Sequence, residues 1–118
     1  MTGSKLQVQE ELLLAKQSRI EGNEGRARVC ARRAAGAAAQ AYLQQAGYRD
    51  RAVNALESLR KLKGDLDLPE RIEVSIRCLL QRVDEEHNLP QDMDLITEAE
   101  KVIRYLETGV LDNQSVDA

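Results

Sequence analysis

The stretch that most constrains the fold is EGRARVCARRAAGAAAQAYLQQAG, residues 24–47, because it combines a helical period with very small side chains. At 100° per residue, the small apolar residues fall on one stripe, formed by Ala27, Cys30, Ala31, Ala34, Ala38 and Ala41. Such a stripe permits the backbone of a neighbouring helix to approach closely. Gly47 is a typical C-terminal stop. We therefore expect a helix that packs tightly against a second one.

The segments on either side of this stretch are helical in pattern as well. LQVQEELLLAKQSRI predicts a first helix over about 5–21, because Gly22 and Asn23 readily adopt the left-handed conformation that ends a helix. Asp50 is a typical N-cap for RAVNALESLRKLK, which keeps a helical period until Gly64. Three helices are thus predicted in the first half of the chain.

The segment DLDLPERIEVSIRCLLQRV predicts a fourth helix that begins near residue 68. Pro69 suits a first helical turn, where its missing N–H costs little, and Asp67 is the candidate cap. The helix must end by Asn88, because Pro90 disfavours helical geometry in the residue before it. This segment has the clearest amphipathic stripe of the chain, made of Ile72, Ile76, Leu79, Leu80 and Val83.

A last helix is predicted from about Asp94 to a stop at Gly109, with an apolar face of Leu95, Ile96, Ala99, Val102, Ile103 and Leu106. The 118 residues include no tryptophan or phenylalanine, whereas alanine, leucine, arginine and glutamate abound, which favours helices over β-sheets. We expect an all-α fold, an antiparallel up-and-down bundle of four to five helices. It forms a single domain over 1–118, of which 108–118 is a short flexible tail.

The sequence has no sign of a membrane span or of a cofactor. No apolar run approaches the ~20 residues that a membrane span requires. The start MTGSKLQVQEE lacks the apolar core of a signal peptide, so we expect a cytoplasmic protein. Cys30 and Cys78 have no metal-ligand spacing and are expected to be reduced thiols, with a disulfide between them as the alternative. We expect no metal, because the acidic run from Asp84 to Asp94 lacks the glycine turn of a calcium loop.

Charge is distributed unevenly along the chain. Residues 1–63 carry 12 Lys/Arg against 6 Asp/Glu, a net charge of +6, whereas residues 64–118 carry 5 against 14, a net charge of −9. The basic half could form a binding face. Alternatively, the two halves attract each other across the bundle or across a dimer. We favour the second interpretation, since charged helix faces are usually just solvated.

Four arginines of the alanine-rich helix are candidate phosphate or nucleotide contacts. Arg26 and Arg33 share one side of this helix, while Arg28 and Arg32 share the opposite side, with the small-residue stripe between them. The four do not form a single basic patch. The alternative is that their aliphatic stems cover the flanks of a buried helix and that their charges pair with acids from the second half.

The order of these segments resembles the HEPN superfamily of small helical bundles over roughly residues 5–107. The resemblance rests on the Gly-Asn turn before an alanine-rich helix, on LESLRKL leading to LPERIEVSIRCLLQRV, and on the closing DMDLITEAEKVIRYL. Some members of this family are metal-independent ribonucleases, often toxins, in which an Arg-x(4–6)-His motif from each protomer meets at a dimer interface. Others lack this site and serve as partner subunits of minimal nucleotidyltransferases or as interaction modules.

Arg82 and His87 match the Arg-x4-His form of that motif. Histidine is suited to proton transfer near neutral pH, and arginine would stabilise charge developing on a phosphate. Val83 follows the arginine, where active family members often have a polar residue, and no tyrosine follows His87. On a continuous helix the two residues are rotated by about 140°, so the ribonuclease hypothesis requires a dimer or a helix that ends before His87.

A structural role for His87 is the alternative, as a helix-end residue half tucked against the core. The acidic residues 84–86 would also repel a phosphate backbone. We therefore expect a non-catalytic binding protein. Its expected partner is a minimal nucleotidyltransferase, with which it would form a pair of the toxin–antitoxin type. A metal-independent endoribonuclease and a purely structural oligomer are the alternatives. A homodimer is expected because several apolar residues lie off the main stripes, namely Leu12, Leu14, Val29 and Leu43.

Overall fold

The computed structural model describes residues 2–47, 55–65, 67–81 and 94–109, and all regular secondary structure in these ranges is α-helical. The prediction of an all-α bundle is confirmed. The five helices of the described ranges are α1 (Thr2–Ile20), α2 (Glu24–Gln45), α3 (Ala55–Asp65), α4 (Glu70–Leu80) and α5 (Leu95–Thr108).

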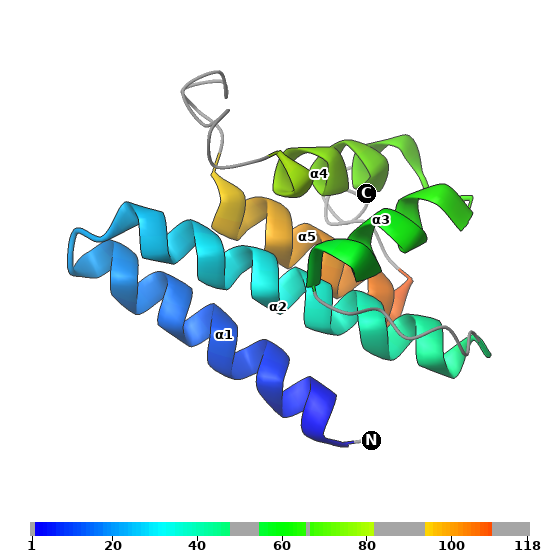
Figure 1. Ribbon diagram of the computed structural model, residues 1–118, viewed down its shortest axis with the longest axis horizontal. Coiled ribbons are helices and arrows are strands. Elements are labelled where there is room, and N and C mark those ends of the chain that lie inside the picture. Colours follow the sequence, from blue (N-terminus) through cyan, green and yellow to red (C-terminus); the bar gives the residue numbers. More distant parts are fainter. Residues whose placement is uncertain (1, 48–54, 66, 82–93, 110–118) are drawn as a thin grey trace, which may run out of the picture.

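Helix α2 is the centre of the arrangement. It packs against α1 on one side and against α3 and α5 on the other, while α4 packs on α5 and α3 (Figure 1). The helices α1 and α2 form one antiparallel hairpin and α4 and α5 form another, so α3 lies in the connection between two pairs (Figure 1). Because α2 contacts three other helices, most of the core depends on how closely they can approach it.

Small side chains allow α2 to be covered on nearly all sides. Of residues 30–39 only Arg33 is exposed, and the buried residues extend well beyond the predicted stripe to include Ala35, Gly36, Ala37 and Ala39. The larger core side chains come from the surrounding helices, chiefly Leu59, Leu62, Ile72, Ile76, Leu79, Leu95 and Val102. Helix α2, with its small side chains, is therefore surrounded by leucine, isoleucine and valine side chains of the neighbouring helices.

Side-chain caps and glycines fix several helix ends. Gly22 has the predicted left-handed conformation at φ 84°, whereas Asn23, for which the same conformation was predicted, has φ −99°. The Asn23 side chain caps α2 by accepting from the Arg26 N–H, and the Asp94 carboxylate caps α5 by accepting from the N–H groups of Ile96 and Thr97. The chain leaves α5 at Gly109 with φ 76°, the left-handed conformation that glycine adopts without strain.

The limits of α3 and α4 differ from prediction. The N-cap of α4 is Pro69 and no side chain caps it, so the prediction that Asp67 is the cap was wrong. Helix α3 passes through Gly64 to Asp65, and the predicted N-cap Asp50 lies outside the described residues. Helix α4 ends at Leu80, well before Asn88, because Gln81 is extended at φ −62°, ψ 133°.

Ion pairs join α1 to the N-terminal ends of α2 and α5. Both guanidinium edges of Arg19 are used: Nη2 lies 2.6 Å from Glu24 Oε2, and Nη1 lies 2.9 Å from Asp94 Oδ1. Further along the same helix, Lys16 Nζ lies 2.8 Å from Glu100. Basic residues of the first half thus pair with acids of the second half within the bundle, which supports attraction between the halves as one use of the uneven charge.

The Arg19 contacts shift the titration of both carboxyls. The hydrogen bond from Arg19 lowers the pKa of Glu24. Burial acts to raise the pKa of Asp94, but the Arg19 hydrogen bond and the Thr97 backbone N–H outweigh it, so this pKa is also lowered. A lowered pKa in the folded state means that the stabilisation is present above the unfolded pKa of about 4 and is lost as the pH falls through the folded value.

We predict that the free energy of unfolding of the wild type decreases between about pH 5 and pH 3, and that Arg19→Gln removes part of this dependence. Both carboxylates are more than one-third exposed, so the difference should stay below about 1 kcal/mol. Urea denaturation at a series of pH values measures it, with Arg26→Gln, an exposed position, as the control. Parallel pH profiles of the wild type and Arg19→Gln would contradict this account.

Candidate functional site

Arg82 and His87, the predicted ribonuclease pair, lie outside the described residues. The structure does fix the point from which their segment departs, because α4 ends at Leu80 and Gln81 is already extended. The objection that a continuous helix would rotate the two side chains about 140° apart assumed that α4 extends past residue 82. Helix α4 does not extend past Leu80, and both the geometry and the chemistry of the pair stay a prediction.

Arg32 determines where α4 ends. It is buried in α2 at 7% exposure and reaches the C-terminal end of α4, where Nε donates to the Leu79 carbonyl at 2.9 Å and Nη2 to the Gln81 carbonyl at 2.8 Å. The last carbonyls of a helix have no partners within the helix and carry partial negative charge. The buried guanidinium donates hydrogen bonds to these carbonyls, and its positive charge offsets their partial negative charge. Arg32 therefore stabilises the fold.

The other three predicted arginines do not converge with Arg32. Arg28 is half-buried and lies 3.8 Å from Glu24 of its own helix, whereas Arg26 and Arg33 are exposed. Two contacts of Arg32 with the second half go to the backbone carbonyls of Leu79 and Gln81. Phosphate binding by the exposed arginines stays a prediction.

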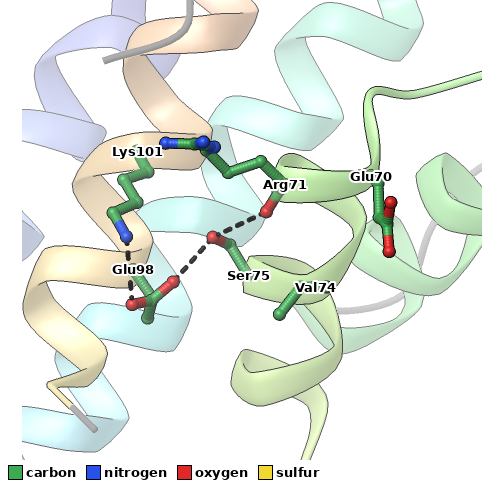
Figure 2. A pocket seen from close by; sticks show the side chains of 6 residues that line it. All are labelled: Glu70, Arg71, Val74, Ser75, Glu98 and Lys101. Carbon is green, nitrogen blue, oxygen red and sulfur yellow. Dashed lines mark hydrogen bonds and ion pairs between the residues drawn. The ribbon is translucent and has the colours of Figure 1, made fainter. Parts of the chain in front are cut away.

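A groove between α4 and α5 brings charged side chains together. Its lining comes from Glu70, Arg71, Val74 and Ser75 of α4 and from Glu98 and Lys101 of α5 (Figure 2). The Ser75 hydroxyl, only 1% exposed as a residue, donates to Glu98 Oε1 at 2.6 Å, and Lys101 Nζ lies 3.4 Å from Glu98 Oε2. Because the hydroxyl of this serine is bound to a carboxylate, it joins the two helices.

The mouth of this groove is cationic on one side. Figure 2 shows Arg71 extending toward Lys101 above the Ser75–Glu98 pair, while the Glu70 carboxylate is directed elsewhere. Burial raises the pKa of the nearby Cys78 thiol, and the negative charge of Glu98 adds to the effect. A raised pKa lowers the thiolate fraction of Cys78 and with it the reactivity of this thiol. Cys30 and Cys78 are both free cysteines, as expected.

Among the residues that the structure describes, the most exposed large apolar side chains lie on α1. Leu6, Leu13 and Ile20 are 57%, 68% and 84% exposed, on the face of α1 opposite its buried residues Val8 and Ala15. We call these three residues the α1 stripe. Leu12 was predicted to lie off the main stripe, and that prediction was wrong because Leu12 packs against the core.

The other apolar residues predicted to lie off the main stripes divide into two groups. Leu43 is buried at 5% exposure, whereas Val29 on α2 is 37% exposed. Within the described ranges, no cluster of three or more potential metal ligands occurs, and no helix combines the length and apolarity of a membrane span. The α1 stripe and the α4/α5 groove are thus the surface features that stand out.

Comparison with protein-family models, curated proteins and solved structures gave no significant match. The resemblance to the HEPN superfamily therefore stays a prediction that rests on the sequence segments alone.

We predict that Arg32→Met lowers the free energy of unfolding by roughly 2 kcal/mol, since it removes charged hydrogen bonds from buried carbonyls while keeping an unbranched apolar stem. Arg33→Met, an exposed change on the same helix, is the matched control and should stay within about 0.5 kcal/mol of the wild type. Urea denaturation measures both values. Equal stability of the two variants would show that Arg32 does not hold the end of α4.

Proposed function

We propose that this protein is a non-catalytic binding protein that acts by docking another protein on its helical bundle. The α1 stripe is the observation that carries the proposal. Single exposed apolar residues are ordinary, but three of them in one line along 15 residues of one helix are typical of an interface. A helix that is apolar on two opposite faces is suited to lie between two neighbours, of which the described part of the chain supplies one.

The family resemblance suggests the class of partner, a minimal nucleotidyltransferase encoded beside the chain. The α4/α5 groove offers a second surface of different chemistry, with Arg71, Lys101 and the 38% exposed Val74 side by side. Charged residues around an apolar centre are the usual composition of a moderately sized protein interface. The bundle could thus contact partners on two of its sides.

A metal-independent endoribonuclease that uses Arg82 and His87 is the second candidate. One observation bears on it: α4 itself ends at Leu80, so the pair does not lie on a continuation of this helix. Acidic residues 84–86 still disfavour a phosphate backbone next to this pair.

We predict that the purified protein does not cleave single-stranded RNA in the presence of EDTA, at micromolar concentration and over hours. A gel of labelled RNA measures this, with His87→Ala beside the wild type to separate the chain's own activity from contaminating nuclease. Cleavage by the wild type that disappears in His87→Ala would overturn the non-catalytic assignment.

A second experiment tests binding. The protein encoded next to this gene is co-expressed with this chain, and the two are purified together. We expect a complex that survives size-exclusion chromatography and whose mass by light scattering equals the sum of defined subunits. Absence of a complex with that protein, together with a strictly monomeric chain, would remove the binding function.

A further inference from the structure

The positive charge of Arg71 is not used by the described part of the fold. Its side chain is exposed, and it makes no hydrogen bond or ion pair with another described residue. The guanidinium groups of Arg19 and Arg32, by contrast, bind carboxylates or carbonyls that hold helices together. Because Arg71 lines the groove between α4 and α5, its charge is available to a ligand in that groove.

Lys101 brings a second positive charge to the same groove from α5. Its ammonium lies 3.4 Å from Glu98 Oε2, and the other oxygen of this carboxylate accepts from the Ser75 hydroxyl at 2.6 Å. The Glu98 side chain is only 14% exposed, whereas that of Lys101 is 28% exposed. The hydrogen-bonded carboxylate therefore holds the ammonium in place at the wall of the groove, and Arg71 extends toward it from α4 (Figure 2).

The charges that face one another in this groove do not balance. Arg71 and Lys101 come together near a single carboxylate, that of Glu98, which already accepts from Ser75 and Lys101. The carboxylate of Glu70, the other acidic residue among the described lining, is directed elsewhere (Figure 2). One more negative charge between the two cations would complete the set, so the groove is complementary to an anion.

We infer that the α4/α5 groove binds the carboxylate of an acidic side chain in a partner protein, with Arg71 and Lys101 as its two cationic contacts. This inference rests on the proposed function, since it takes the groove as a protein-binding surface, and it deepens that function by naming the chemistry of the bound segment. The planar guanidinium of arginine can donate two parallel hydrogen bonds to a carboxylate. The lysine ammonium adds a compact charge beside it.

The lining of the groove favours a carboxylate over a nucleic acid. Glu70 and Glu98 lie in the same lining as the two cations, so a chain of phosphates would meet negative charge beside the positive charge. A single carboxylate needs only the two cations. Val74, which is 38% exposed at the same groove, offers an apolar contact to the residue next to the acid. An acidic residue beside an apolar one is therefore the expected motif of the partner.

The exposure of Arg71 limits the affinity for a short ligand. Ion pairs between exposed groups contribute little, because water and salt screen them. A short acidic peptide should therefore bind with a Kd on the order of 1 mM, and binding should weaken as salt is added. A complete partner protein should bind more tightly, since it adds contacts around the groove.

An NMR titration of the isotope-labelled full chain tests the inference, with a short peptide of alternating glutamate and leucine as the probe. We expect amide shifts at residues 70–75 and 98–101, and a Kd higher by roughly fivefold or more in Arg71→Gln. Arg77→Gln is the matched control, because Arg77 is an exposed arginine of the same helix outside the lining of the groove, and its Kd should equal that of the wild type. Unfolding in urea shows that both variants are folded.

Three further probes identify the anion. A peptide of alternating glutamine and leucine keeps the apolar side chains and removes the charge, so it should not shift the amides of the groove. Inorganic phosphate and a short oligoadenylate should bind the groove more weakly than the glutamate peptide does. The inference would be overturned by equal shifts with the glutamine peptide, by tighter binding of phosphate or RNA, by an unchanged Kd in Arg71→Gln, or by no shifts in the groove up to about 10 mM glutamate peptide.

Failure of this inference is distinguishable from failure of the proposed function. A chain that binds the neighbouring gene product equally well in the wild type and in Arg71→Gln, and does not bind the glutamate peptide, retains the function and loses the inference, because the partner then docks on another surface. Peptide binding at the groove without a complex with that gene product supports the inference and changes the identity of the partner. A chain that binds neither would remove both.

Discussion

The close approach that small side chains allow along α2 is the constraint on which the rest of the structure depends. Residues 30–39 of this helix are buried except for Arg33, and most of them are alanine or glycine. Three other helices can therefore contact α2 at once, and they supply the leucine, isoleucine and valine that fill the space around it. Arg32 is the one large side chain in that buried run, and it connects α2 to the carbonyls that end α4.

The surface features follow from the same packing. Since α2 occupies the centre, α1 is held on one side by its Val8–Ala15 face and is left with the opposite face exposed (Figure 1). Ion pairs from Lys16 and Arg19 to α5 add contacts where few apolar ones exist between these two helices. An α1 helix with apolar residues on two faces and ion pairs along one flank is the basis of the binding function that we propose, whereas the buried Ser75 joins α4 to α5.

Much of the fold could be predicted from the sequence, because periodicity and caps are local. The Gly22 and Gly109 stops, the start of α5 near Asp94 and the apolar face of α5 lie where their patterns indicate. The misplaced features depend on tertiary contacts. The end of α4 is set by Arg32, 47 residues away from Leu79, and the choice between Leu12 and Leu13 for the core depends on which side of α1 faces α2. Neither feature can be predicted from a local sequence pattern. The candidate pair Arg82 and His87 lies outside the described residues.

The most direct test of the central claim is the change in the free energy of unfolding caused by Ala34→Leu, measured by urea denaturation beside Gln40→Leu. Ala34 is fully buried where helices meet α2, and Gln40 is exposed on the same helix. If close approach to α2 holds the bundle together, Ala34→Leu should cost about 1–3 kcal/mol through overpacking. The exposed control should change by less than about 0.5 kcal/mol. Equal stability of the two variants would contradict the account, because it would mean that α2 has room for larger side chains.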